Sequence, residues 1–322
     1  MNTIIRFQFC FSAMLAVVGL NTVVVEASAA AKCVKTTKND PVWRGCWKNG
    51  EIRYENQMRA GKRHGVCKVW DRYGKLIGKY NYKNGLLDGK QWELKGDLVT
   101  VSGFRNGVRH GNFAKIFKRA KKYKVKGQFV DGKADGLWKY FKPGGIKTKE
   151  VVFDQNDAKS FTKFYPSGKK MMVGQGADGK QRGTWTQWSE YGKIQWVRNY
   201  KDGKRHGESR HFHPRTGELL SISNYQKGLQ HGVEKRFSTK TKFVKGGVLT
   251  HERYWKKGKE HGTWRTFSNG DPHQFHDVNG NRNRKFKAGE KTSETVYRKG
   301  KQIRSCAYQG PRRSVWKCVT YR

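Results

Sequence analysis

The chain of 322 residues carries 68 Lys and Arg against 25 Asp and Glu, which gives a formal charge of +43 spread over its length. Such a chain repels itself and seeks an acidic partner, such as nucleic acid, anionic lipid, phosphorylated envelope polymer or an acidic protein. High charge is also typical of disorder, but aromatic residues make up 13% of the sequence and recur at fixed intervals, which excludes a disordered chain.

The first segment, residues 1–31, has the pattern of a secretory signal. Arg6 precedes a largely apolar run over residues 7–25, and residues 27–31 offer small side chains for cleavage. An uncleaved signal anchor is the alternative. No later segment is apolar enough to span a bilayer, so we expect no transmembrane segment after cleavage and a secreted or periplasmic protein.

Five cysteines remain after residue 31, and an oxidising compartment makes disulfides their default state. Two pairs with similar spacing stand at opposite ends, which predicts Cys33–Cys46 and Cys306–Cys318 bridges and leaves Cys67 free. No C-x-x-C motif is present, which argues against a zinc or thioredoxin-type site.

A short repeat fills the middle of the chain. An opening glycine returns every 22 to 30 residues, with Asn156 in its place once, and a second glycine follows four residues later. An aromatic residue stands three positions before most opening glycines. The opening positions are Gly61, Gly85, Gly107, Gly132, Asn156, Gly179, Gly203, Gly228 and Gly258. A fixed period of this size indicates a repeat architecture.

The repeats read as β-hairpins. Asn-Gly or Asp-Gly stands at many opening positions, and this dipeptide favours positive φ at both centres of a two-residue hairpin turn. We therefore predict an all-β fold: an elongated, single-layer antiparallel meander of about nine repeated β-hairpins with a right-handed twist and strands of four to seven residues. The expected divisions are a signal (1–31), an N-terminal cap (32–60), the repeat array (61–275) and a C-terminal cap (276–322).

Two packing expectations follow from the pattern. Each rung should bury an aromatic ring against a glycine of its neighbour, which places Trp185 and Trp264 as spacers and Gly207 as a ring seat. Basic and aromatic residues alternate, as in residues 138–142. Alternation on a strand would place rings on one face and cations on the other.

Units such as YKDGKRHGESRHF (200–212) and WKKGKEHGTWRTF (255–267) resemble MORN repeats, most closely the MORN-variant repeat of bacterial antitoxin-like proteins. The resemblance covers roughly residues 50 to 275. It implies an array of β-hairpins that binds proteins or phospholipids, here in a secreted form. The signal argues against an antitoxin role in the cytoplasm.

The histidine of the GKRHG motif has three readings. Its slot, three residues after the opening position, also holds Asp and Arg, which favours a role in the turn over proton transfer or metal binding. Successive rungs would lie about 10 Å apart, too far to share zinc at about 2.0–2.1 Å from each nitrogen. A basic ridge that gains charge below about pH 6.5 and a metal site are the alternatives.

The functional prediction is a non-enzymatic scaffold that docks on an anionic surface, either lipid headgroups or phosphorylated envelope polymer. A protein–protein adaptor or inhibitor that captures an acidic protein is the alternative. Nucleic acid ranks lower because the signal directs the chain away from the cytosol. No catalytic motif and no cofactor or metal signature is found. The predicted anion-binding residues are Lys62, Arg63, His64, Arg109, His110, Lys204, Arg205, His206, His231, Lys259 and His261.

Overall fold

The computed structural model describes residues 33–242, 244–271, 287–309 and 315–321, so the predicted signal lies outside the described residues. The chain divides into two compact units, residues 1–146 and residues 147–322. The boundary falls inside the region predicted as one repeat array. The described residues contain no helix, and so no helix long and apolar enough to cross a bilayer.

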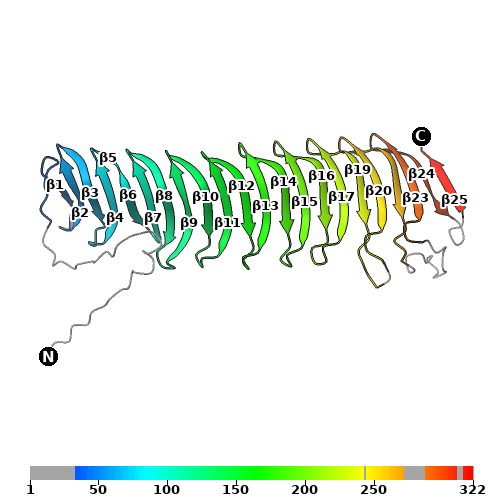
Figure 1. Cartoon of the computed structure of the whole chain (residues 1–322), viewed down its shortest axis with the longest axis horizontal. Helices are drawn as coiled ribbons and strands as arrows, with labels where there is room; N and C mark the ends of the chain where they lie inside the picture. Colours follow the sequence, from blue (N-terminus) through cyan, green and yellow to red (C-terminus); the bar gives the residue numbers. More distant parts are fainter. Residues whose placement is uncertain (1–32, 243, 272–286, 310–314, 322) are drawn as a thin grey trace, which may run out of the picture. The chain divides into compact units, whose positions relative to one another are not determined.

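The first unit is an antiparallel meander in which strands follow one another in chain order (Figure 1). Its strands are β1 (Val42–Cys46), β2 (Ile52–Arg59), β3 (Lys62–Trp70), β4 (Leu76–Lys83), β5 (Leu86–Leu87), β6 (Gly89–Lys95), β7 (Leu98–Arg105), β8 (Val108–Phe117), β9 (Lys122–Val130) and β10 (Lys133–Phe141).

The second unit repeats the same plan. Its strands are β11 (Lys147–Asp154), β12 (Asp157–Phe164), β13 (Lys170–Ala177), β14 (Lys180–Trp188), β15 (Ile194–Lys201), β16 (Lys204–Phe212), β17 (Leu219–Gln226), β18 (Leu229–Gln230), β19 (Gly232–Phe237), β20 (Leu249–Lys256), β21 (Lys259–Glu260), β22 (Gly262–Phe267), β23 (Lys291–Arg298), β24 (Lys301–Gln309) and β25 (Val315–Thr320). The predicted all-β meander of hairpins is confirmed, although most strands are longer than the expected four to seven residues.

Two-residue turns with positive φ join the strands of each rung at one edge, which we call the turn edge. Asn84 and Gly85 have φ of 51° and 86°, and Asp202 and Gly203 have 52° and 77°. The same geometry recurs where the first residue is not Asn or Asp, as at Lys257 (51°). The Asn-Gly and Asp-Gly prediction is therefore confirmed. Glycine stands at the second centre of most of these turns, and Asn156 takes its place once with φ of 74°.

Successive turns are joined by one repeated backbone hydrogen bond. The N–H of an opening glycine donates to a carbonyl oxygen of the preceding rung, as from Gly85 to Arg63 (2.8 Å), Gly228 to Arg205 (2.8 Å) and Gly300 to Glu260 (2.8 Å). Short loops that close on a glycine form the opposite edge, the loop edge. Residues 71–74 and 189–192 are examples, with the Gly74 and Gly192 amides donating to Asp71 and Ser189.

The second glycine of each rung lies at a break in the ladder. Gly207 has φ of 82°, and pairing between β15 and β16 shifts register between Arg198 and Tyr200. A side-chain amide four residues before the opening glycine spans this break: Asn199 donates to the Glu208 carbonyl at 2.9 Å, and Asn224 donates to Val233 at 3.0 Å. Sequence analysis missed this amide position, although Asn or Gln occupies it in most rungs.

Aromatic rings pack over glycines, as predicted, but not over Gly207. Trp138 covers Gly127 and Trp185 covers Gly174, and the two tryptophans are 6% and 9% exposed. A Cβ on Gly207 would meet only the Asn199 Cβ, at 3.9 Å, so the proposal of Gly207 as a ring seat was wrong. Its positive φ explains the glycine.

The cysteine prediction is confirmed. Disulfides join Cys33 to Cys46 and Cys306 to Cys318, and Cys67 is a buried free thiol. Burial raises the pKa of the Cys67 thiol above its ordinary value. The two disulfides are consistent with an oxidising compartment.

Candidate anion-binding site

The predicted lysines and arginines lie at the turn edge but in different surroundings. Lys62, Lys204 and Lys259 directly follow opening glycines and are exposed. Arg63 and Arg205 are half-buried: each guanidinium lies over a tyrosine of the next rung, at 5.3 Å for Arg63 on Tyr82 and 5.0 Å for Arg205 on Tyr225. These two arginines therefore serve rung packing as well as charge.

Arg109 shows the same stacking in an exposed position, with its guanidinium 5.4 Å from the Phe129 ring centroid. The predicted separation of rings and cations onto opposite faces is thus wrong at these sites. Arg63 also donates to the Tyr82 hydroxyl at 3.4 Å. At these three rungs cations and rings share a face, because the arginine two residues after the opening glycine reaches the aromatic residue of the next rung.

The predicted histidines form links between rungs. The backbone N–H of the first turn residue in the next rung donates to the Nδ1 of His64 (from Asn84, 3.4 Å), His110 (from Asp131, 3.5 Å) and His231 (from Lys257, 3.4 Å). Asp88 occupies the same slot and accepts from the Asn106 amide at 3.1 Å. This supports the turn reading and explains why Asp replaces His.

The other two histidines differ. His261 lies beside the Tyr254 ring, with centroids 6.0 Å apart, and His206 is exposed. Within the described part of the chain, no group of three or more His, Cys, Asp or Glu side chains could hold a metal ion.

Four rungs carry two cations directly opposite each other across the turn. We call these the cation pairs: Arg59–Lys62, Lys201–Lys204, Lys256–Lys259 and Arg298–Lys301. Side chains directly opposite in an antiparallel pair have Cβ atoms about 4.5–5.5 Å apart, and like charges there are destabilising. All eight side chains are exposed, and among the described residues none has a carboxylate within ion-pair distance.

An acidic pair in the second unit shows the opposite arrangement. Asp154 and Asp157 also face each other across a turn, but the Lys159 ammonium lies 3.5 Å from Asp154 and 2.8 Å from Asp157. This interaction lowers the pKa of Asp157 and raises that of Lys159. The acidic pair has its own counter-ion, whereas the cation pairs leave their repulsion uncompensated. Near Lys201–Lys204, the turn residue Asp202 is 3.8 Å from Arg182.

Sequence analysis named one member of three cation pairs and missed the fourth pair. Arg59, Lys201 and Lys256 stand two residues before an opening glycine, a position that was not aligned. The rung around Gly300 was assigned to the C-terminal cap, because it follows Gly258 by 300 − 258 = 42 residues. The sequence does contain a motif that could have identified this rung, because RKGK at 298–301 repeats KKGK at 256–259.

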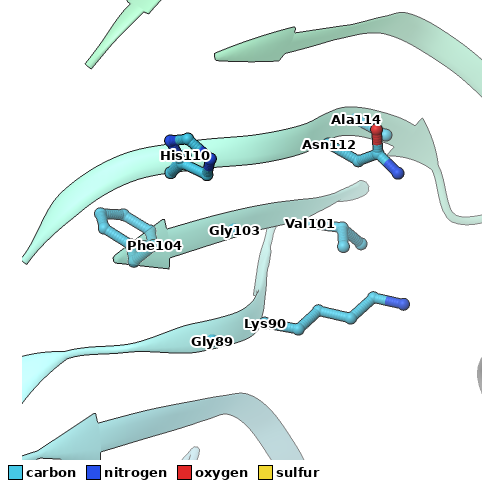
Figure 2. A pocket seen from close by; sticks show the side chains of 8 residues that line it. All are labelled: Gly89, Lys90, Val101, Gly103, Phe104, His110, Asn112 and Ala114. Carbon is cyan, nitrogen blue, oxygen red and sulfur yellow. The ribbon is translucent and has the colours of Figure 1, made fainter. Parts of the chain in front are cut away.

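A hollow of about 250 Å³ lies in the first unit, lined by residues of β6, β7 and β8 (Figure 2). Gly103 occupies the position that holds the bridging amide in other rungs, so this side chain is missing here. Val101 and Ala114 add only small apolar side chains. Figure 2 shows Lys90 extending along this lining, and partial burial lowers the pKa of its ammonium. A Cβ on Gly103 would collide with the His110 carbonyl oxygen, so no larger side chain fits at this position.

Comparisons with known proteins add only weak likenesses. No family model and no curated protein matches the sequence. A crystal structure of TcdB2-TccC3-Cdc42 is 11% identical, with 87% of this chain and 19% of that chain covered at a TM-score of 0.19. A structure of the Photorhabdus luminescens Tc holotoxin pore is 10% identical, with 80% of this chain and 15% of that chain covered at a TM-score of 0.19. A porin-like protein from Bacteroides uniformis is 9% identical, with 87% of this chain and 94% of that chain covered at a TM-score of 0.13.

The chain thus spans about a fifth of the first matched structure. Likenesses at these TM-scores carry no argument about function. The resemblance to MORN-variant repeats stays a prediction based on the motif.

Proposed function

We propose that this chain is a secreted or periplasmic, non-enzymatic scaffold that docks on phosphate-bearing anionic surfaces through its cation pairs. The observation that carries the proposal is the contrast between the pairs. Asp154–Asp157 has a lysine between its carboxylates, whereas four cation pairs have no carboxylate within ion-pair distance among the described residues. An external anion would relieve that repulsion.

The composition supports the same conclusion. Solubility of a small domain needs a net charge of only about 2–8, and this chain carries +43. The cations recur at equivalent positions of repeated rungs, so one extended anionic partner would meet several of them. The proposed location outside the cytosol rests on the signal pattern and agrees with the two disulfides.

The first prediction tests this function with the purified chain. We expect binding to phosphatidylglycerol vesicles and to long-chain polyphosphate at low salt, none to phosphatidylcholine vesicles, and a steep loss as salt rises, because each neutralised phosphate releases counter-ions. Co-sedimentation and anisotropy over a salt series measure this. Absence of binding to every anionic probe, or salt-independent binding, would contradict the proposal. Salt-independent capture of an acidic protein would instead favour the adaptor.

Variants locate the contact. Replacing Arg59, Lys62, Lys201 and Lys204 with serine should weaken binding more than replacing Lys170, Lys193, Lys240 and Lys245, which are exposed lysines of the second unit away from the turn edge. Both variants remove four charges. Arg63 and Arg205 are left intact, because their loss would also remove ring contacts.

A further inference from the structure

Two of the cation pairs belong to neighbouring rungs of the second unit. The Gly300 amide donates to the Glu260 carbonyl at 2.8 Å, which joins the turn at 256–259 to the turn at 298–301. Residues 42 positions apart in sequence are thereby brought side by side, at about two strand spacings or 10 Å. Lys257 and Lys299 stand at the tips of these turns, with φ of 51° and 52°.

The four paired cations lie on one face of the sheet. The Trp264 ring contacts Trp255 and Tyr297, with centroids 5.2 Å and 4.6 Å apart, so these three rings share the opposite face. Side chains alternate along a strand, so Lys256 and Arg298, which directly follow Trp255 and Tyr297, leave from the other face. Their partners Lys259 and Lys301 leave from that same face.

The carboxylate nearest to these cations, that of Glu260, projects from the same face of the sheet as the aromatic rings. Glu260 is the direct partner of Trp255 in the ladder, so its side chain lies on the side of the rings. Burial raises the pKa of Tyr297, and the negative charge of Glu260 raises it further. Glu260 therefore does not neutralise the cations on the opposite face.

The backbone between the two turns is also uncovered. In most earlier rungs, although not at Gly179, the residue after an opening glycine lies against the next glycine: Lys204 is 3.7 Å from a Cβ placed on Gly228, and Leu229 is 3.5 Å from one on Gly258. No atom lies within 4 Å of a Cβ placed on Gly300. Lys259 does not cover this glycine, which leaves room for a ligand group beside the turn.

We propose that Lys256, Lys257, Lys259, Arg298, Lys299 and Lys301 form a binding track for a linear chain of phosphate groups. This inference rests on the proposed function, and it specifies the class of ligand and the residues that bind it. Six exposed cations on two rungs require several negative charges on one ligand, and Arg298 offers a planar fork for a phosphate. The two turns carry no aromatic or aliphatic side chain that would enter a bilayer, which favours a soluble polymer over a membrane.

The test compares phosphate chains of different length. We expect the purified chain to bind long-chain polyphosphate far more tightly than tripolyphosphate and to show no measurable affinity for orthophosphate, because only a long chain reaches both turns. Equal affinity for tripolyphosphate and long-chain polyphosphate would overturn the track, as would binding to phosphatidylglycerol vesicles that exceeds binding to polyphosphate at equal phosphate concentration.

Serine substitution at Lys256, Lys259, Arg298 and Lys301 tests whether polyphosphate binds at these two turns. Each contact with a single-stranded polyanion contributes about 0.7 to the slope of log affinity against log salt, so the slope should fall by about 3. The variant at Lys170, Lys193, Lys240 and Lys245, with the same loss of charge, should retain most of the slope. Equal losses would overturn the track, whereas the proposed function is judged separately, by the vesicle and polyphosphate binding of the unmodified chain and by the variant at Arg59, Lys62, Lys201 and Lys204.

A folding control accompanies both variants. The midpoint of urea unfolding should not fall in the track variant, because removing like charges that face each other relieves repulsion. If it does fall, the single substitutions Lys257→Ser and Lys299→Ser, at the exposed tips, replace it, and each should lower the slope by about 0.7. An unchanged slope in both would overturn the track.

Discussion

At the residue scale, the recurring histidine contacts the following turn through Nδ1, which lies near a backbone N–H and, at His64 and His110, also near a side-chain oxygen. The Nδ1 atoms of His64, His110 and His231 face a backbone N–H of the following turn, and Asp88 does the same with a carboxylate. What the slot shares is a polar side chain that reaches the next turn, since Arg182 in the same slot lies 3.8 Å from the turn residue Asp202, and neither a proton transfer nor a metal is needed. Sequence analysis reached this reading from the Asp substitutions, but only the structure identifies the donor.

The acceptor role makes a prediction at His64. His64→Ala leaves the Asn84 amide without this partner and should lower the free energy of unfolding by about 0.5–1.5 kcal/mol, the usual net worth of one hydrogen bond. His64→Asp should recover most of the loss, because Asp88 makes the equivalent bond to Asn106. Urea unfolding of the two variants measures the difference. Equal destabilisation by Ala and Asp would show that the slot needs the imidazole itself.

At the element scale, burial distinguishes two tryptophans that the repeat pattern places in the same position. The indole N–H of Trp185 donates to the Gln175 carbonyl at 2.9 Å, and that of Trp264 donates to Tyr254 at 3.0 Å. Trp185 lies on Gly174 and is 9% exposed. Trp264 is only half-buried and has the Arg253 guanidinium 4.9 Å from its ring centroid.

We therefore expect unequal costs for the two tryptophans. Trp185→Ala should lower the free energy of unfolding by about 3–5 kcal/mol, the range for a large buried ring. Trp264→Ala removes a matching hydrogen bond but less buried area, so it should cost clearly less. The two variants are compared by denaturant unfolding, with Trp→Phe at each position as the conservative control. A larger loss at Trp264 would contradict the burial argument.

At the scale of the whole molecule, the positions of the turns could be predicted from the sequence, but the side-chain contacts between neighbouring rungs could not. Asn84-Gly85 and Asp202-Gly203 could be predicted as turns, because Asn-Gly and Asp-Gly favour positive φ at both positions. The stacking of Arg63 on Tyr82 depends on which side chain of the next rung it meets, and the one-letter pattern does not specify this. The rung at Gly300 was missed because a long insertion broke the period, and the cation pairs became visible only with the strand register.

The whole-molecule register also explains where the disulfides act. Cys306 and Cys318 face each other in the ladder between β24 and β25, and Cys33–Cys46 closes the start of the first unit. Stability in a repeat array is a sum over neighbouring rungs, so the effect of each bridge should be confined to its own unit.

The last prediction uses the two bridges as mutual controls. Cys306→Ala with Cys318→Ala should raise amide hydrogen exchange in β24 and β25 and lower the stability of that end by about 3 kcal/mol, the loop-entropy value for a loop of this size. Exchange in β2 and β3 of the first unit should not change. Cys33→Ala with Cys46→Ala should give the converse pattern, because β1 pairs only with β2 among the described strands. Exchange that rises throughout both units in either variant would show that the chain opens as one cooperative body, contrary to the additive behaviour expected of independent rungs.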